Sequence, residues 1–242
     1  MIYFVKILKI LHLMILINII QMILLALWTI FIVYILAPIL NYKGAWWITI
    51  HLWAPGIALI LGSRIIVKGI EHIHPSKHYI FMANHASYFD IACLFATTKR
   101  NLHFIAKDEL SRNFFTGYML RKLQIIFIDR TNSQRSATSL KKAVEHIKHG
   151  KNVAIFPEGT RTKTGNLGIF RKGGFKLAVQ SQTPIIPVAI SKSAIAWPRS
   201  NFGFRPTTVT VTFGPEISVE HVSEDDTKIL VDQVYSFISK SL

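Results

Sequence analysis

The sequence predicts an α/β fold in which a mainly parallel, mixed sheet is flanked by helices and preceded by an N-terminal hydrophobic helical hairpin. Two observations support this prediction. From residue 64 onward, short apolar runs rich in β-branched residues alternate with helical patterns, the order expected for strands connected by helices. Residues 1–63 contain three lysines and no acidic residue, and most of the others are apolar.

The apolar first quarter of the chain contains two uncharged spans, residues 10–42 and 44–63. The first is longer than the roughly 20 apolar residues that cross a bilayer, and too long for the core of a signal peptide. The second contains His51 and Pro55, so it could cross the membrane or dip in and return. A buried hairpin packed on the rest of the protein is the alternative. We expect a membrane-inserted helical hairpin at 1–63 and a catalytic domain at 64–242.

Charge sets the expected orientation and partners. Lys6 and Lys9 precede the hairpin, Arg64 and Lys68 follow it, and only Lys43 lies in its turn. The positive-inside bias therefore places both ends in the cytoplasm, and the active site on the cytoplasmic face of the membrane, the inner membrane in a bacterium. The formal net charge of +15 suits anionic lipid, a phosphorylated substrate or nucleic acid.

The single cysteine, Cys93, excludes an intramolecular disulfide and a multi-cysteine metal site. We expect no metal and no cofactor.

Seven strands and several helices are expected after the hairpin. The helices are residues 139–148, 172–181 and 226–241, with a further one that starts after Ser87. The last strand alternates sharply between apolar and polar residues, as expected near a sheet edge. The expected strands are residues 64–68, 79–83, 102–105, 125–129, 152–156, 185–190 and 207–213.

The stretch from Asn84 to Asp90 is the most informative one, because it follows the apolar run 79–83 and precedes a helix. Ser87 is a candidate N-cap, with Asp90 three residues on, as in a capping box. His85 in the loop and Asp90 in the first helical turn can then face each other, although in an unbroken helix they would point apart. A carboxylate on one imidazole nitrogen leaves the other free as a general base. These two residues alone do not establish catalysis, however. Asp90 could be only a capping carboxylate, and His85 could have a purely structural role.

Three more strands end in polar residues, at the edge where open α/β sheets bind ligands. These residues are Asp129-Arg130, Pro157–Arg161 and Ser191-Lys192. The guanidinium group binds phosphate with two parallel hydrogen bonds, so two arginines at this edge suggest a phosphorylated substrate. Each arginine alone could be a solvated surface charge, and Glu158 could pair with one of them.

Together these segments resemble the four motifs of the glycerolipid acyltransferase family, which includes 1-acyl-sn-glycerol-3-phosphate acyltransferases. The matching blocks are Asn84–Asp90, Phe127–Arg130, Phe156–Arg161 and Ile186–Ala189, and the resemblance covers about residues 64–215. The chain departs from the family pattern in two places. Leu123-Gln124 stands where a glycine is common, and Thr162 stands where a serine is usual.

The resemblance implies acyl transfer from a thioester, acyl-CoA or acyl carrier protein, to the sn-2 hydroxyl of 1-acyl-sn-glycerol 3-phosphate (lysophosphatidic acid), which makes phosphatidic acid. His85 would be the base and Asp90 its orienting carboxylate. Arg130 and Arg161 would bind the phosphate, and Glu158, Gly159 and Thr160 would shape the glycerol end. No Gly-x-Ser-x-Gly motif occurs, so direct transfer is expected rather than an acyl-enzyme.

Three other functions are weighed against this one. The first is acyl transfer to a different lysolipid, which the paired arginines disfavour. The second is a catalytically silent protein that binds anionic lipid in the membrane, which the intact His85/Asp90 pair disfavours. The third is nucleic-acid binding, which the charge alone suggests and no motif supports.

Overall fold

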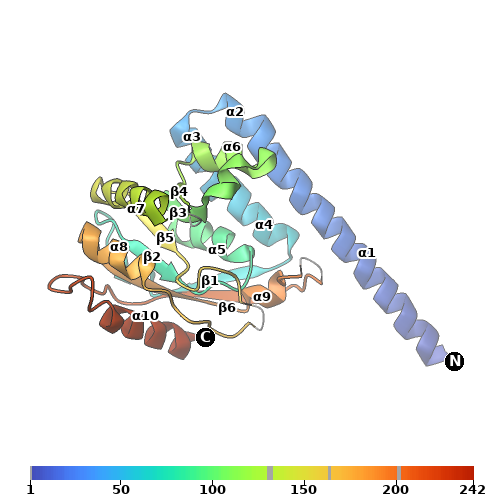
Figure 1. The fold of residues 1–242 in the computed structure, drawn as a ribbon. Coiled ribbons are helices and arrows are strands. Elements are labelled where there is room, and N and C mark those ends of the chain that lie inside the picture. The colour runs from blue at the N-terminus through green and yellow to red at the C-terminus, as the bar shows by residue number, and fades with distance from the viewer. Residues whose placement is uncertain (1, 130–132, 163–164, 201–202) are drawn as a thin grey trace.

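The computed structural model describes residues 2–129, 133–162, 165–200 and 203–242. It contains one seven-stranded sheet, in the order β1-β7-β6-β2-β5-β3-β4 (Figure 1). All seven expected strands are present within a residue or two of their expected bounds. The strands are β1 (Arg64–Lys68), β2 (Ile80–Ala83), β3 (Leu102–Lys107), β4 (Ile126–Ile128), β5 (Asn152–Ile155), β6 (Ile185–Ser191) and β7 (Thr208–Phe213).

Five of the six strand pairs are parallel, and only β6 and β7 are antiparallel. This confirms the predicted mixed, mainly parallel sheet. β7 is covered by β1 on its outer side, so it lies one strand in from the edge. At the centre, β2 pairs in parallel with both β5 and β6. Their carboxyl ends therefore meet at one edge of the sheet.

Helices cover both faces of the sheet, and the side chains of β2 pack alternately against the helices on the two faces. Phe81 belongs to the core on the side of α5 (Phe89–Thr98), whereas its neighbours Ile80 and Met82 belong to the core on the opposite side. Because both faces are covered, β2 is apolar throughout, and full burial of each such side chain contributes about 1.5–3 kcal/mol. The helices on the opposite side are α7 (Ser133–Lys148), α8 (Gly173–Ser181) and α10 (Lys228–Ser241).

The N-terminal segment forms a helical hairpin, as predicted. Its outward leg is α1 (Ile2–Ile30), continued by η1 (Phe31–Leu36) and α2 (Ala37–Ile39). The chain turns at Asn41, whose side chain accepts a hydrogen bond from the Gly44 amide at 2.9 Å and so caps the return leg. The return leg consists of α3 (Tyr42–Ile48), η2 (Thr49–Trp53) and α4 (Ala54–Ile60).

The return leg packs on the α/β domain and shares its core. Trp46 makes edge contacts with Phe95 of α5 at 5.9 Å between ring centroids, and with His103 of β3 at 5.2 Å. Burial lowers the pKa of His103 to about 4, so this imidazole is neutral near pH 7 and suits an apolar contact. The second apolar span therefore packs on the domain, the alternative that the sequence left open for the hairpin.

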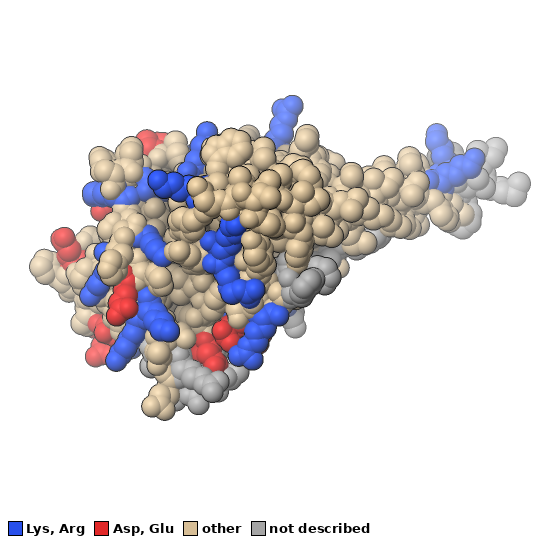
Figure 2. Space-filling view, turned by 90° about the horizontal axis from the view of Figure 1, so that it is seen from above, with Lys and Arg blue, Asp and Glu red and all other residues tan. Residues whose placement is uncertain are grey.

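The outward leg behaves differently. In the part of the chain that the structure describes, the helix Lys6–Ile39 is the one long and apolar enough to cross a membrane. Gln21 of α1 donates to the Ile60 carbonyl at 3.0 Å, and Trp53 donates to the Thr29 hydroxyl at 3.2 Å, so the inner part is fixed to the return leg. The N-terminal part of α1 projects from the domain (Figure 1), and apolar side chains such as Ile10, Leu13 and Leu16 are exposed on it. On the face that Figure 2 shows, the cations of this projection lie near its free end.

Two α-helices of the catalytic domain are absent from the sequence-based prediction, the short α9 (Ser193–Ala196) and the longer α6. Residues 114–122 form α6 (Phe114–Lys122) just before β4, although Gly117 weakens the helix propensity of this segment. At the following turn, Gln124 adopts a left-handed conformation with φ of 50°. This is the position where the resemblance leads one to expect glycine, and the unusual φ explains that preference.

Candidate active site

The loop between β2 and α5 brings His85 and Asp90 together. His85 Nδ1 lies 2.8 Å from Asp90 Oδ2, and the side chains are 14% and 0% exposed. A carboxylate can only accept, so Nδ1 carries the proton and Nε2 presents its lone pair. Among the described residues, no protein group forms a hydrogen bond to Nε2. This is the arrangement of a general base whose tautomer is fixed by a carboxylate.

The same oxygen of Asp90 also organises the loop. Asp90 Oδ2 accepts hydrogen bonds from the amides of Ala86 and Ser87, each at 2.8 Å. The Ser87 hydroxyl in turn accepts from the Phe89 amide at 3.0 Å. The predicted capping box is only partly present, because the N-cap of α5 is Tyr88 rather than Ser87 and has no side-chain cap. The contact of Asp90 with the Ser87 amide still resembles one half of such a box, displaced by one residue. Asp90 therefore stabilises the turn that starts the helix and orients His85 at once, although the sequence offered these roles as alternatives.

The imidazole ring is fixed from a second direction by the neighbouring strand. Phe156 follows β5 and stacks on His85, with 3.9 Å between ring centroids and an interplanar angle of 12°. The Thr162 amide donates to the His85 carbonyl at 2.8 Å. The His-x4-Asp loop and the Phe156–Arg161 segment therefore form one unit, because β2 and β5 are adjacent parallel strands.

Glu158 connects this unit to the loop that leads into α8. One of its carboxylate oxygens accepts from the His85 amide at 2.7 Å, and the other accepts from the Gly168 amide at 3.0 Å. Burial raises the pKa of this carboxyl above its usual value, and the two amide donors oppose that effect. Its oxygens contact the backbone on both sides of the site, so Glu158 positions the His85 loop. The expectation that it also shapes the glycerol site stays a prediction.

Arg161 lies on the other side of His85. Its guanidinium carbon is 3.6 Å from the centre of the Tyr88 ring, a close cation–π contact. The Arg161 Nη1 atom is buried and has no hydrogen-bond partner among the described residues. It is a charged donor that an anion could satisfy. The structure thus brings Arg161 to the same loop as His85, through a tyrosine that the sequence analysis did not single out.

The remaining predicted residues lie around this turn. Gly159 has φ of 72°, a conformation that favours glycine, and its amide donates to the Phe156 carbonyl at 2.9 Å. The side chain of Thr160 is exposed. Arg130 lies outside the described residues. Lys107, at the end of β3 beside β5, is a further cation at this edge, and its position after an apolar strand was the signal that could have identified it.

The segment after β6 closes another side of the site. Asn84 forms two hydrogen bonds with the Ile190 backbone, at 2.7 and 2.9 Å, which fix the start of the His85 loop to β6. The Ser87 hydroxyl donates to the Trp197 carbonyl at 2.7 Å, and the Trp197 ring lies 5.7 Å from that of Tyr88. No sequence motif marked Trp197, because its role depends on a contact across more than 100 residues.

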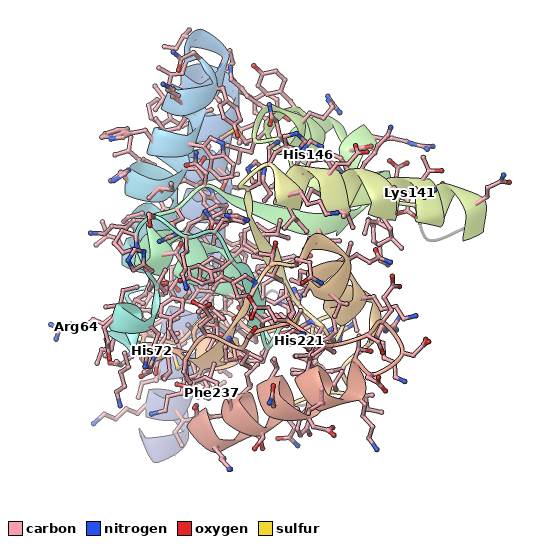
Figure 3. The ribbon with its side chains drawn as sticks, turned by 90° about the vertical axis from the view of Figure 1, so that its left-hand side faces the viewer. Arg64, His72, Lys141, His146, His221 and Phe237 are labelled. Atoms are coloured by element: carbon pink, nitrogen blue, oxygen red, sulfur yellow. The ribbon has the colours of Figure 1, made fainter. Side chains whose placement is uncertain are left out.

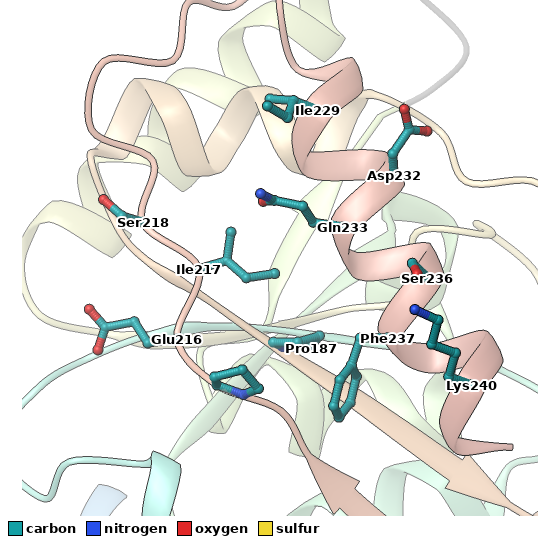
Figure 4. A pocket seen from close by; sticks show the side chains of 11 residues that line it. Pro187, Glu216, Ile217, Ser218, Ile229, Asp232, Gln233, Ser236, Phe237 and Lys240 are labelled. Carbon is teal, nitrogen blue, oxygen red and sulfur yellow. The ribbon is translucent and has the colours of Figure 1, made fainter.

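A surface groove lies elsewhere. A groove of about 830 Å³ runs between α10 and the segment that follows β7, lined by Ile217, Gln233 and Phe237 among others (Figure 4). None of the predicted site residues lines it. Within the described ranges, no three histidine, cysteine, aspartate or glutamate side chains are grouped so as to bind a metal ion. The site itself combines an imidazole oriented by a carboxylate with a guanidinium group that has a buried donor without a partner among the described residues.

Comparison with known proteins places this arrangement in a family. A family model described as Acyltransferase matches residues 64–191, which contain all the predicted site residues. The chain belongs to the acyltransferase family. The fold class and the enzyme class predicted from the sequence are thereby confirmed at the level of the family.

Two curated relatives of this acyltransferase share a name. The 1-acyl-sn-glycerol-3-phosphate acyltransferase of Limnanthes douglasii is 31% identical over 79% of this chain and 68% of its own length. The enzyme of that name from Pseudomonas aeruginosa is 31% identical over 77% of this chain and 74% of its own length. Among solved structures, the 1-acyl-sn-glycerophosphate acyltransferase of Thermotoga maritima has the same fold, with a TM-score of 0.78, 24% identity, and coverage of 93% of this chain and 94% of that one.

Proposed function

We propose that this acyltransferase transfers a fatty acyl group from a thioester to the sn-2 hydroxyl of 1-acyl-sn-glycerol 3-phosphate and so produces phosphatidic acid. The observation that carries the proposal is the pairing of His85 with Asp90 beside Arg161, a base and a phosphate-binding group in one site. The names of the relatives support the same acceptor.

In the proposed reaction, His85 Nε2 removes the hydroxyl proton of the acceptor as that oxygen attacks the thioester carbonyl. The carbon–oxygen bond forms, the carbon–sulfur bond breaks, and the imidazolium returns the proton to the departing thiolate. Asp90 stabilises the transient imidazolium through its contact with Nδ1. Because this carboxylate is fully buried and fixed by two amides, it needs no rearrangement during the reaction.

Arg161 would bind the acceptor phosphate, together with Arg130, which lies outside the described residues. The buried Nη1 donor of Arg161 suits a phosphate oxygen, because phosphate accepts several charge-assisted hydrogen bonds. Gly159 and Thr160 lie in the same turn and would contact the glycerol end of the acceptor. Binding of this kind orients the attacking hydroxyl relative to His85, and orientation can supply several kcal/mol of the barrier.

The membrane location is part of the proposal. The helical hairpin at 1–63 would insert through α1, and the catalytic domain at 64–242 would face the cytoplasm, following the lysines that flank the hairpin. Both substrates carry fatty chains, so a site beside the lipid surface lets each enter without leaving the bilayer fully. The thioester is carried by coenzyme A or by acyl carrier protein.

An assay of the purified full-length protein in mixed micelles tests the proposal. Three acceptors, lysophosphatidic acid, a lysophosphatidylcholine and a monoacylglycerol, are compared with acyl-CoA and with acyl carrier protein as donor. We expect phosphatidic acid from the first acceptor, and much slower transfer to the other two. Faster transfer to an acceptor without a phosphate monoester would contradict the proposed substrate. Absence of transfer from both donors would contradict the proposed reaction.

Substitution of Arg161 tests the phosphate-binding role. Arg161→Ala should raise the KM for lysophosphatidic acid about 10- to 100-fold, the range that the loss of one charge-assisted hydrogen bond implies. Turnover at saturation should fall less, because Arg130, Gly159 and Thr160 would still orient the acceptor once it is bound.

Arg64→Ala is the matched control. Arg64 is an exposed arginine on the edge strand β1, remote from β2 in the sheet (Figure 3). Its loss should leave the KM unchanged. An unchanged KM in the Arg161 variant would remove this residue from phosphate binding.

A further inference from the structure

Next to the site, the chain presents an isoleucine to solvent. The side chain of Ile169 is 90% exposed, the highest value among the exposed large hydrophobic residues, in the loop between β5 and α8. Single exposed apolar residues are common on soluble surfaces and need no explanation by themselves. Three features distinguish Ile169 from such residues: its position next to the site, the contacts that hold its neighbours in the chain, and the cations beside it.

The backbone on both sides of Ile169 is fixed, so the exposure is built into the fold. On one side, the Gly168 amide donates to Glu158 at 3.0 Å, the glutamate that also accepts from the His85 amide at 2.7 Å. On the other side, Phe170 is buried and stacks on Phe175 at 6.4 Å. Both neighbours of Ile169 are therefore held by contacts within the protein, whereas Ile169 itself is exposed.

The charges next to this residue are cationic. Arg171 and Lys172 directly follow in sequence, and both are exposed. The Arg171 amide donates to the Pro157 carbonyl at 2.9 Å, which ties these cations to the same turn as Glu158. An aliphatic side chain beside exposed cations has the composition of a surface that meets anionic lipid. We call Gly168–Lys172 the lipid-facing loop.

The opposite side of the site leads to the membrane helix. Arg161 stacks on Tyr88, and Tyr88 lies against Trp197. Trp197 makes an edge contact with Phe204 at 5.8 Å, and the Phe204 amide donates to the Asn18 side chain of α1. Continuous contacts thus connect the site to α1 where its projecting part begins. The His85 loop therefore has contacts with this helix through Tyr88 and with the lipid-facing loop through Glu158.

We propose that the lipid-facing loop is a second membrane contact, with Ile169 in the interfacial region of the bilayer and Arg171 and Lys172 on anionic headgroups. The contact would hold the mouth of the site against the lipid surface from the side opposite α1. It goes beyond the proposed function, and rests on it only in that the acceptor is a membrane lipid. The proposed partner of the loop is the lipid bilayer rather than a carrier protein. The acceptor is itself a membrane lipid, so this side of the site has to lie at the membrane surface for the acceptor to enter.

A single-cysteine label tests the contact without any turnover. Cys93 is fully buried and burial raises its pKa, so the thiol should not react in the folded protein. Ile169→Cys in the otherwise unchanged full chain is therefore labelled selectively with an environment-sensitive fluorophore, and the protein is reconstituted into phosphatidylcholine–phosphatidylglycerol vesicles. Ile229→Cys is the control, since Ile229 is 55% exposed at the start of α10, away from the free end of α1 (Figure 1).

The expected result is a blue-shifted emission at position 169 that spin-labelled lipids quench and aqueous iodide does not, with the reverse at position 229. A label at 169 that iodide quenches as readily as the one at 229 would overturn the proposal. Protection at 169 that appears only after acyl carrier protein is added would also overturn it, in favour of a protein partner. None of these readouts requires acyl transfer, so failure of the proposed function is seen separately.

A kinetic comparison then measures the effect of the contact. Ile169→Glu should raise the apparent KM for lysophosphatidic acid in anionic vesicles about tenfold, the scale of burying one aliphatic side chain. In detergent micelles with a short-chain, water-soluble acceptor it should equal the unsubstituted protein. Ile169→Leu should restore the KM in vesicles, whereas Ile229→Glu should not change it. An Ile169→Glu variant that performs equally in both settings would overturn the proposed role.

Discussion

Substitution of His85 by alanine should reduce kcat for acyl transfer by a factor of about 10²–10⁴, the range supplied by a positioned general base. The reason lies in the geometry, because Nδ1 is committed to Asp90 and the phenyl ring of Phe156 covers one face of the imidazole. No other basic side chain occupies this position among the described residues. Initial rates with saturating lysophosphatidic acid and acyl thioester give the measurement, and the KM for both substrates should change little.

The control for this substitution is His146→Ala. His146 is exposed in the last turn of α7, which leads into the start of β5, whereas the site lies at the carboxyl end of that strand (Figure 3). Its side chain contacts Lys151. Its loss should leave kcat unchanged, whereas membrane association should be normal in both variants because α1 is intact. Acyl transfer by the His85 variant at more than a tenth of the normal rate would remove His85 from the role of base.

Substitution of Asp90 by asparagine is expected to have a comparably large effect, a loss in kcat of about 10³-fold or more, as when the orienting carboxylate of a catalytic triad is replaced by an amide. An amide oxygen in the place of Oδ2 can still accept from the Ala86 and Ser87 amides and from His85 Nδ1, so the loop stays folded. It carries no negative charge, however, and so it no longer stabilises the imidazolium that forms when His85 takes up the proton.

Two comparisons separate this electronic effect from loss of structure. The thermal midpoint of Asp90→Asn in detergent should stay near that of the unsubstituted protein, whereas Asp90→Ala should unfold earlier because it leaves buried amides unpaired, at about 1–3 kcal/mol each. Asp108→Asn, which affects only an exposed ion pair with Arg112, should be fully active. If Asp90→Asn kept most of its activity, the carboxylate would be only a helix cap.

Much of the fold could be predicted because the strands are fully buried. A strand covered on both faces must be apolar throughout, so Ile80–Ala83 and Ile185–Ile190 are visible as apolar runs. The polar residues that follow these runs could be assigned to one functional edge, because neighbouring parallel strands end at the same edge of the sheet. The α6 helix was missed because its residues show no clear apolar periodicity around Gly117.

The sequence by itself determined the family, the seven strands, the apolar hairpin and the two residues expected to do chemistry. These features depend on local composition and on spacing along the chain. Only the tertiary structure decided that Asp90 both fixes the turn before α5 and orients His85, that Glu158 accepts from the His85 and Gly168 amides, and that Tyr88 lies under Arg161. It also decided that the second apolar span packs on α5. Each of these depends on which strands are neighbours in the sheet, a property of long-range packing that no local pattern encodes.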